Sequence, residues 1–302
     1  MEDTFNEGLS VLIPIFNYSI IPLLKELSHQ ASQSGIPFEI ICMDDCSLPE
    51  WKITNQHIES FPGVTYKQLP SNVGRSKIRN LLFASSKFSC LLFLDCDTKI
   101  EKKDFLKNYW DLKDCPVIVG GREYTTLPPQ ESKYKLHWVV GKKREEFSAG
   151  IRMKHPYKSL MFNNIFIHKK SYQQIQLDEK ITTYGHEDTK FGYMLQSLKI
   201  PVLHIDNPGI HVGLDDTTSF LKKTIEGVEN LQKLIGQGIG QDTLLYHSYS
   251  FLKKIGMAFI FLKLYNFILK KMVYRNLHSD TPSLVCFDIY KLASLIEANK
   301  KK

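Results

Sequence analysis

The sequence lacks several features that would assign it to a class of protein at once. Its 302 residues contain no apolar run long enough to span a bilayer, and the longest, 255–262, is ended by Lys263. The opening residues Met1-Glu2-Asp3 are acidic and include no basic segment, so we expect no secretory signal peptide. There is also no internal repeat and no low-complexity tract. We therefore expect an ordinary globular protein.

Cysteine usage and net charge exclude two further classes. The cysteines have neither metal-ligand spacing nor the density of a small disulfide-bonded domain, so we expect buried thiols in the cytoplasm. They are Cys42, Cys46, Cys90, Cys96, Cys115 and Cys286. A formal net charge of +7 is too small to indicate a nucleic-acid partner, and we expect none. A polyanionic substrate or an anionic membrane surface would fit that charge as well.

Short apolar runs alternate with helical patterns over residues 9–213. We expect strands at 9–14, 38–43, 64–68, 90–94, 117–119, 162–168 and 201–205, and helices at 20–34, 50–60, 75–85, 103–112, from 170, and at 189–198. A β-α-β alternation favours a mostly parallel sheet with helices on both faces. The fold class predicted from this pattern is α/β, with a Rossmann-like nucleotide-binding half.

Two parts of the chain depart from this alternation. Residues 122–158 are polar and basic with little periodicity, so we expect a long irregular segment there. From residue 215 no strand pattern remains. We expect helices at 217–236, 243–275 and 287–299. The predicted organisation is one α/β domain at 1–214 and a C-terminal helical region at 215–302.

Acidic residues follow two of the predicted strands. Asp95 and Asp97 come directly after the strand at 90–94, and Asp44 and Asp45 follow the strand at 38–43. The carboxyl ends of parallel strands meet at one edge, where open α/β sheets bind ligands. Neighbouring carboxylates repel each other unless a cation lies between them, and a divalent ion that also holds a phosphate would serve. The alternative is that either pair only forms a turn.

Three other groups of residues could complete such a site. Arg75 and Arg79 begin a predicted helix, whose amino terminus favours anions; the alternative is a solvated basic face. Glu187 and Asp188 stand at another helix start, where they are either a general base with its neighbour or simple caps. His211 follows the last strand and could reach a metal held by the acids, or it is structural.

Taken in order, these segments resemble the family 2 glycosyltransferases, inverting enzymes of the GT-A fold, over residues 9–213. The matching motifs are Ser10-Val-Leu-Ile-Pro14 with Asn17-Tyr18, Met43-Asp-Asp-Cys-Ser47, Asn72-Val-Gly74 with Arg79-Asn80, Leu94-Asp-Cys-Asp97, Asn163-Asn164 and Glu187-Asp188. The chain departs from the commonest form at Cys46, where glycine is frequent, and at His186. Neither departure removes a side chain that the chemistry needs.

The resemblance implies a nucleotide-sugar site with a divalent ion, Mg²⁺ or Mn²⁺. The nucleobase side of the donor falls to Asp44 or Asp45, between which the sequence does not choose. The ribose and the metal fall to Asp95 and Asp97, and His211 completes the metal site. The other nucleotide-sugar contacts implied at matching positions are Pro14, Asn17, Asn72, Arg75, Arg79 and Asn164.

The implied reaction is a single displacement that inverts the sugar. Asp188, supported by Glu187, takes the proton from an acceptor hydroxyl, which attacks the anomeric carbon from the face opposite the nucleotide. The donor is a nucleotide-diphosphate sugar, expected to be UDP-linked. The acceptor is a saccharide or is lipid-linked, in polysaccharide or glycolipid biosynthesis, and residues 122–158 and the tail would shape its site.

The tail suggests further partners. Residues 255–269 are apolar with flanking lysines, which suits a helix lying in a membrane interface. Peripheral contact through 250–275 would place the protein on the inner face of the membrane. The alternative is that this helix packs on the α/β domain or on a second subunit, forming a homodimer.

Two other functions are compatible with paired acids on a parallel sheet. A nucleotidyltransferase would be expected to have a glycine-rich, basic loop after its first strand, where this chain has Ile13-Pro14-Ile-Phe-Asn-Tyr18. A non-catalytic nucleotide-sugar-binding protein on the same fold is the other, and the presence of all the acids argues against it.

Overall fold

The computed structural model describes residues 5–158 and 160–300. The chain divides into two compact units. One comprises residues 1–124, 146–182 and 191–213, and the other comprises 125–145, 183–190 and 214–302. The expected boundary at 214 coincides with the end of the first unit, but two earlier segments also belong with the C-terminal helices.

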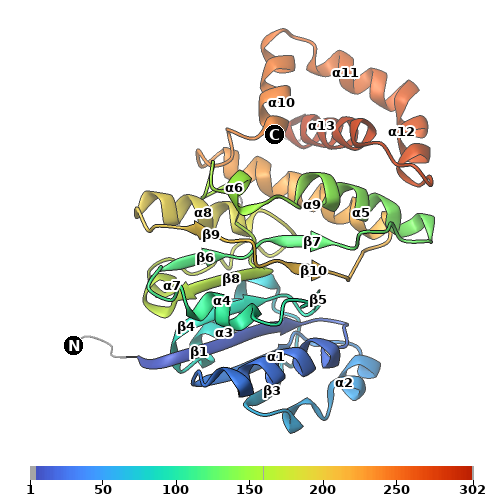
Figure 1. The fold of residues 1–302 in the computed structure, drawn as a ribbon. Coiled ribbons are helices and arrows are strands. Elements are labelled where there is room, and N and C mark those ends of the chain that lie inside the picture. The colour runs from blue at the N-terminus through green and yellow to red at the C-terminus, as the bar shows by residue number, and fades with distance from the viewer. Residues whose placement is uncertain (1–4, 159, 301–302) are drawn as a thin grey trace. The chain divides into compact units, whose positions relative to one another are not determined.

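A seven-stranded sheet forms the centre of the first unit (Figure 1). Its strands are β1 (Asn6–Ile15), β2 (Phe38–Asp44), β3 (Val64–Gln68), β4 (Phe88–Leu94), β6 (Val117–Val119), β8 (Asn164–His168) and β9 (Leu203–His204). They lie in the order β3-β2-β1-β4-β8-β6-β9. Only β8 runs against its neighbours in this sheet, so the mostly parallel arrangement expected from the sequence is confirmed.

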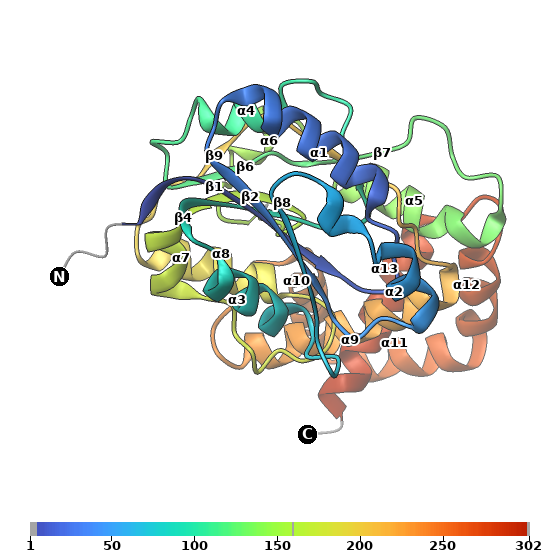
Figure 2. The ribbon, with the colours of Figure 1, turned by 90° about the horizontal axis from the view of Figure 1, so that it is seen from below.

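Helices cover both faces of this sheet. They are α1 (Ile21–Ser34), α2 (Pro49–Asn55), the 3₁₀ helix η1 (Ile58–Ser60), α3 (Arg75–Ser85), α4 (Phe105–Trp110), α6 (Ala149–Arg152), α7 (Lys169–Ile175) and α8 (Glu187–Ser197). Figure 2 shows α1 and α4 on one side of β1 and α3 and α7 on the other. Val11 and Ile13 join the core under α1 and α4, while Leu12 joins the core under α3 and α7. Burial on both faces explains why β1 is apolar without alternation from Val11 to Ile15.

A second, small sheet joins two distant parts of the first unit. It consists of β5 (Thr98–Lys99), β10 (Gly209–His211) and β7 (Arg122–Tyr124), in that spatial order. β10 is antiparallel to β5, and His211 pairs with Thr98. The residues that follow β4 are therefore held beside the residues that follow β9.

The second unit is helical. Its helices are α5 (Ser132–Arg144), α9 (Thr217–Ile235), α10 (Leu244–Lys254), α11 (Ala258–Leu264), the π-helix η2 (Tyr265–Leu269), α12 (Lys270–Leu277) and α13 (Leu284–Lys300). α13 packs against α9, α10, α11 and α12, and Leu136 and Val140 of α5 share a core with Phe220 and Phe287. No helix within the described residues is both long and apolar enough to cross a membrane.

Two predictions of local structure are wrong. Residues 122–158 are not irregular, because they contain β7, α5 and α6. The buried face of α5 includes His137 and Gly141 beside Leu136 and Val140, so half of its helical stripe is not apolar. The single helix expected at 243–275 is broken after α10, where Gly256 adopts a left-handed φ of 74° that ends a helix.

Candidate nucleotide and metal site

The small sheet brings Asp97 and His211 together. Because His211 pairs with Thr98, the Asp97 carbonyl accepts a hydrogen bond from the backbone of Val212 at 3.0 Å. Nδ1 of His211 lies 3.2 Å from Oδ1 of Asp97. Tyr124 packs edge-on against the imidazole, with ring centroids 5.5 Å apart. The histidine ring is thereby held against a carboxylate at the carboxyl edge of the sheet.

The Asp97 carboxylate fits the role of a ligand to a hard divalent cation. Its buried Oδ1 has no hydrogen-bond partner in the part of the chain that the structure describes, since the contact with His211 lacks hydrogen-bond geometry. Its Oδ2 occupies space that a Cβ on Gly213 would enter, at 2.4 Å. Residues 5–158 and 160–300 include no cluster of three or more acid, histidine or cysteine side chains suited to a metal. Mg²⁺ or Mn²⁺ on Asp97 and His211 would need further oxygens from a diphosphate and water.

Asp95 lies in a cluster of arginines. Arg79 Nη2 donates to its Oδ1 at 2.8 Å, while Arg122 and Arg75 lie 3.5 Å and 3.7 Å from Oδ2. Burial raises the pKa of Asp95, but the three guanidinium groups together with His211 outweigh burial and lower that pKa to about 2. Asp95 therefore stays ionised and holds these arginines in place. Its expected contact with ribose or a metal stays a prediction.

The arginines of this cluster differ in what they can reach. Arg79 is buried and also donates to the carbonyl oxygen of Arg75 at 3.3 Å. Its guanidinium therefore binds protein groups inside the fold. The side chain of Arg75 is 40% exposed, at the first position of α3. A partly exposed guanidinium at a helix amino terminus suits a phosphate oxygen.

The two acids after β2 hold backbone groups. Asp44 is fully buried and accepts from the N–H of Ser47 at 2.7 Å and from the hydroxyl of Tyr66 at 3.3 Å. Asp45 accepts from the two successive N–H groups that precede α3, at 2.7 Å and 3.1 Å. The Ser47 bond is that of the turn that was the alternative for this pair, whereas the Asp45 bonds join this loop to the loop before α3. A nucleobase contact stays a prediction.

Asn164, in β8, links this strand to neighbouring segments through side-chain hydrogen bonds. It has no exposed surface, and its amide donates to the carbonyl oxygens of Gly121 and Asn207 at 2.9 Å and 2.8 Å. Its Oδ1 accepts from the Tyr109 hydroxyl at 2.5 Å. All of these partners are protein groups at the same edge of the sheet, so Asn164 supports the shape of that edge.

The remaining predicted contacts lie at the same edge, Asn17 and Asn72 in loops and Pro14 near the end of β1. Asn17 has a left-handed φ of 50°, and its Oδ1 accepts from the N–H of Leu48 at 2.9 Å. Asn72 is exposed and donates to the carbonyl of Asp45 at 3.1 Å. Pro14 is the partly exposed residue near the end of β1. These residues therefore shape the loops that follow β1 and β2.

Glu187 and Asp188 begin α8 and belong to the second unit, where α9 braces the loop that precedes them. The amide of Asn230 lies 3.2–3.3 Å from the carbonyl oxygens of residues 183–185, and Glu226 accepts from the backbone of Tyr184 at 3.2 Å. Glu187 is buried, whereas Asp188 is partly exposed. Of the two residues Asp188 is the more exposed, as a general base that meets a substrate must be, although its Oδ1 is itself buried.

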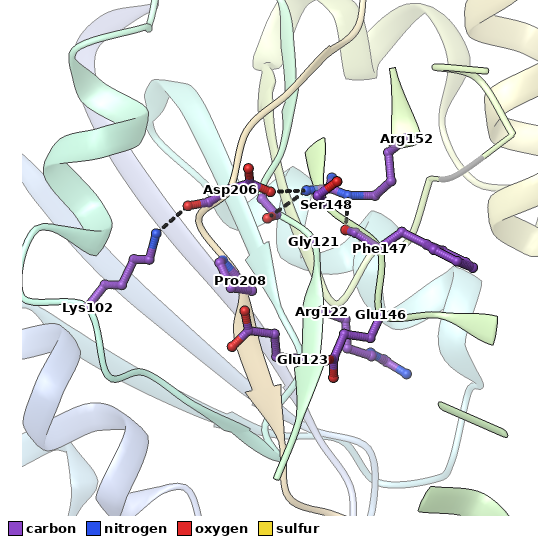
Figure 3. Close-up of a pocket in the computed structure, with 11 residues that line it drawn as sticks. Lys102, Gly121, Arg122, Glu123, Glu146, Phe147, Ser148, Arg152, Asp206 and Pro208 are labelled. Atoms are coloured by element: carbon purple, nitrogen blue, oxygen red, sulfur yellow. Dashed lines mark hydrogen bonds and ion pairs between the residues drawn. The ribbon is translucent and has the colours of Figure 1, made fainter. Parts of the chain in front are cut away.

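A cavity of about 340 Å³ lies between β7, α6 and the connection from β9 to β10 (Figure 3). The buried guanidinium of Arg152 in its wall donates to backbone carbonyl groups at 2.7–3.1 Å. Asp206 lies 3.8 Å from Arg152, and its carbonyl accepts from Lys102. Neither Asp97 nor His211 lines the cavity. Arg152, Asp206 and Lys102 are engaged with protein groups, and we assign the cavity no ligand.

Sequence reasoning missed two residues of this edge and left one without a role. Arg122 lies in the segment expected to be irregular, where two preceding glycines were the only sign of a turn at the sheet edge. Gly213 could have been found only from its place two residues after a candidate ligand. Tyr18 was part of a motif. Burial first, and then the charge of Asp97, raise the pKa of its hydroxyl.

A mostly parallel α/β sheet that gathers a carboxylate, a histidine and an accessible arginine at its carboxyl edge has the features of a nucleotide-phosphate-binding fold. The sequence then assigns the family. The family model described as "Glycosyl transferase family 2" matches residues 10–175, more than half of the chain. The chain belongs to glycosyl transferase family 2.

Curated relatives agree with this assignment. The chain is 26% identical to a chondroitin synthase of Escherichia coli over 222 residues, which are 63% of this chain and 32% of that protein. It is 31% identical over 139 residues to an uncharacterized glycosyltransferase of Haemophilus influenzae, covering 41% of this chain and 45% of that protein. The chain thus spans less than half the length of these curated relatives.

Solved structures show the same fold at low sequence identity. The mannosyltransferase PcManGT from Pyrobaculum calidifontis, in complex with GDP-Man and Mn²⁺, matches with a TM-score of 0.59 and 13% identity, over 99% of this chain and 89% of that one. Residues 1–349 of S. aureus TarS, in complex with UDP, match with a TM-score of 0.50 and 15% identity, over 97% and 91%. The GT-A type of architecture is therefore confirmed.

Proposed function

We propose that this protein is an inverting glycosyltransferase that moves a sugar from a nucleotide-diphosphate sugar to an acceptor hydroxyl. The observation that carries the proposal is the pairing of Asp97 with His211 at the carboxyl edge of a family 2 sheet. A carboxylate with a buried oxygen beside an imidazole suits a divalent ion on a diphosphate.

The donor would lie along the carboxyl edge of β1, β2 and β4. Asp97 and His211 would hold Mg²⁺ or Mn²⁺, and Arg75 would bind a phosphate oxygen. When bound, such an ion would neutralise charge on the departing diphosphate. We assign the nucleobase contact to Asp45, because Asp44 has no exposed surface.

Asp188 would act as the general base. It would take the proton of the acceptor hydroxyl while that oxygen attacks the anomeric carbon, and the sugar–diphosphate bond would break on the opposite face. General-base assistance contributes about 10²–10⁴-fold to a rate. The support for this role is the match of Glu187-Asp188 to the family motif and the partial exposure of Asp188 in the first turn of α8, after a loop that α9 braces.

The names of relatives and neighbours suggest substrates. The chondroitin synthases among the relatives favour a role in polysaccharide biosynthesis, and the neighbour complexes contain UDP and GDP-Man. We propose a UDP-linked donor and a saccharide or lipid-linked acceptor. All six cysteines are free thiols, in keeping with the cytoplasmic location that we propose.

A panel of UDP- and GDP-linked sugars tests the reaction class. We expect release of nucleoside diphosphate from one donor, dependent on Mn²⁺ or Mg²⁺. A nucleotidyltransferase would instead release pyrophosphate from a nucleoside triphosphate and a sugar phosphate. Donor binding by calorimetry without any turnover would indicate a non-catalytic binding protein.

Two variants test the residue roles. We expect Asp188→Asn to abolish transfer while the donor still binds, because only the proton acceptor is lost. Asp97→Ala should weaken Mn²⁺-dependent binding of UDP, whereas Asp104→Ala, an exposed acid before α4, should not. Normal turnover by Asp188→Asn, or equal UDP affinity of Asp97→Ala with and without Mn²⁺, would remove the corresponding role.

A further inference from the structure

One stretch of the second unit differs in charge from the rest of the chain. Residues 244–279 contain no aspartate or glutamate. Over the same stretch they contain five lysines and one arginine, namely Lys253, Lys254, Lys263, Lys270, Lys271 and Arg275. All six cationic side chains are exposed. The stretch is therefore uniformly basic, in a chain whose acids and bases are otherwise mixed.

The same helices expose a large amount of apolar surface. One side of α11, η2 and α12 is buried against α13 through Leu262, Tyr265 and Val273. The residues between these contacts should then be polar if the outer side only faced water. Many of them are instead apolar, and over residues 244–279 the exposed large apolar side chains are Leu244, Phe251, Ile255, Met257, Phe259, Ile260, Leu264, Phe267, Ile268, Met272 and Tyr274. Figure 1 shows α10, α11 and α12 arranged around α13.

Two of the three most exposed of these side chains lie beside lysines. Phe267 is 85% exposed and Ile268 is 66% exposed, and Lys270 and Lys271 follow them. Lys263 lies over the ring of Phe259, with Nζ 4.7 Å from the ring centroid. Aromatic and aliphatic side chains bordered by cations are the composition of a helix at an anionic membrane surface.

Charge decides between the two surfaces that could cover this face. Two copies of the chain meeting through the same patch would bring its cations against their own counterparts, with no acid in the patch to pair them. An anionic lipid surface supplies the opposite charge and accepts the apolar side chains at the same time. We propose that the outer face of α10, α11, η2 and α12 lies on an anionic lipid bilayer, with its apolar side chains in the headgroup region.

Vesicle flotation of the full chain tests this proposal without any substrate, so its outcome is independent of the glycosyltransferase activity. We expect the chain to float with phosphatidylcholine vesicles that contain phosphatidylglycerol, and not with phosphatidylcholine alone. Binding should weaken as salt is raised, because the attraction is electrostatic in part. Lys270→Ala with Lys271→Ala should lower the partition coefficient about 30-fold, since each lysine contributes about a factor of five.

The apolar contribution is tested by Phe267→Ser with Ile268→Ser, which we expect to lower partitioning at least about 100-fold. Both positions are exposed, so the fold should be unaffected. Leu127→Ser is the matched control, because Leu127 is 78% exposed but lies outside 244–279.

The proposal fails if the wild type does not float with anionic vesicles, or if the serine variant floats as well as the control. It also fails if sedimentation shows a lipid-free dimer that the serine variant abolishes, since a second copy would then cover this face.

Discussion

Cys46 occupies a backbone conformation that suits glycine. Its φ is 62°, in the left-handed region where a Cβ is unfavourable by about 1–2 kcal/mol. The departure from the family pattern at this position therefore has an energetic consequence. We expect Cys46→Gly to raise the free energy of unfolding by about 0.5–1 kcal/mol, because relief of strain exceeds the added entropy of the unfolded chain. Urea denaturation measures the change.

Cys46→Ala separates backbone strain from the loss of the thiol. Alanine keeps a Cβ and so keeps the strain, while it removes the long contact of Sγ with the Pro70 carbonyl at 3.6 Å. We expect alanine to leave the free energy of unfolding unchanged or slightly lower. Equal stabilisation by alanine and glycine would show that the thiol, and not the backbone angle, is unfavourable.

Asp95 makes stability depend on acid pH. Its pKa in the folded protein is lowered to about 2, against about 3.9 for a free aspartate, so folding favours the ionised form. A lowered pKa adds stability that is complete above about pH 4 and is lost as the pH falls towards 2. In Asp95→Asn the arginines lose their partner, and we expect a loss of about 3 kcal/mol at neutral pH. Urea denaturation across pH 3–7 should show the two proteins converging at low pH; a constant difference would contradict the assignment.

Helices and strands with a regular pattern were predictable from their own residues. α3 begins and ends at the predicted residues 75 and 85, because Gly74 precedes it and its buried residues recur at helical spacing. β2 and β4 were visible as apolar runs that end in acids. The direction of β8 was not predictable, because a five-residue buried strand carries no sign of the strand beside which it pairs.

The sequence indicated which residues lie at the site better than it indicated what each of them does there. The sequence places Asp44 and Asp45 at the right edge, but a carboxylate that accepts from N–H groups of a loop has the same local pattern as one that accepts from a ligand. Arg122 was missed because its three-residue strand is too short for any periodicity. Asp97 and His211 are separated by more than a hundred residues, and only the pairing of β5 with β10 joins them.

The contact between α9 and the loop before α8 provides a test of how the general base is held. Asn230 ties the carbonyl groups of residues 183–185 to α9. We expect Asn230→Ala to lower kcat on the order of 10-fold to 100-fold, because Asp188 would no longer be held in a fixed position for proton transfer. Donor affinity should be unchanged. Amide hydrogen exchange over residues 183–188 should become faster in the same variant.

Glu229→Ala is the matched control for that experiment. Glu229 is the exposed residue next to Asn230 on α9, and the same truncation there leaves the loop contacts in place. We expect wild-type kcat and wild-type exchange from it. If exchange quickens in Asn230→Ala while kcat is unaffected, the brace is structural and Asp188 does not depend on it.

A single boundary in the sequence does not divide the chain into its two compact units. The sequence suggested a boundary at 214, because strand patterns cease there. The structure assigns residues 125–145 to the helical unit, since Leu136 and Val140 of α5 pack with Phe220 of α9 and His137 stacks on the same ring at 4.4 Å. The polar, basic composition of 122–158 distinguished this part of the chain but not the unit with which it packs, which is why sequence alone did not reveal the insertion.

The chain 1–214 tests which boundary holds. That chain would keep α5 but lose α9 and α13, so Leu136 and Val140 would face water. We expect it to aggregate or to unfold at least about 5 °C below the full chain in calorimetry.

A second version, in which a short Gly/Ser linker replaces 125–145, should regain solubility and a cooperative transition. The linker can be short, because the N–H of Tyr124 lies 2.9 Å from the carboxylate of Glu146. Cooperative unfolding of the unmodified 1–214 chain at the temperature of the full chain would instead establish 1–214 as an independent domain.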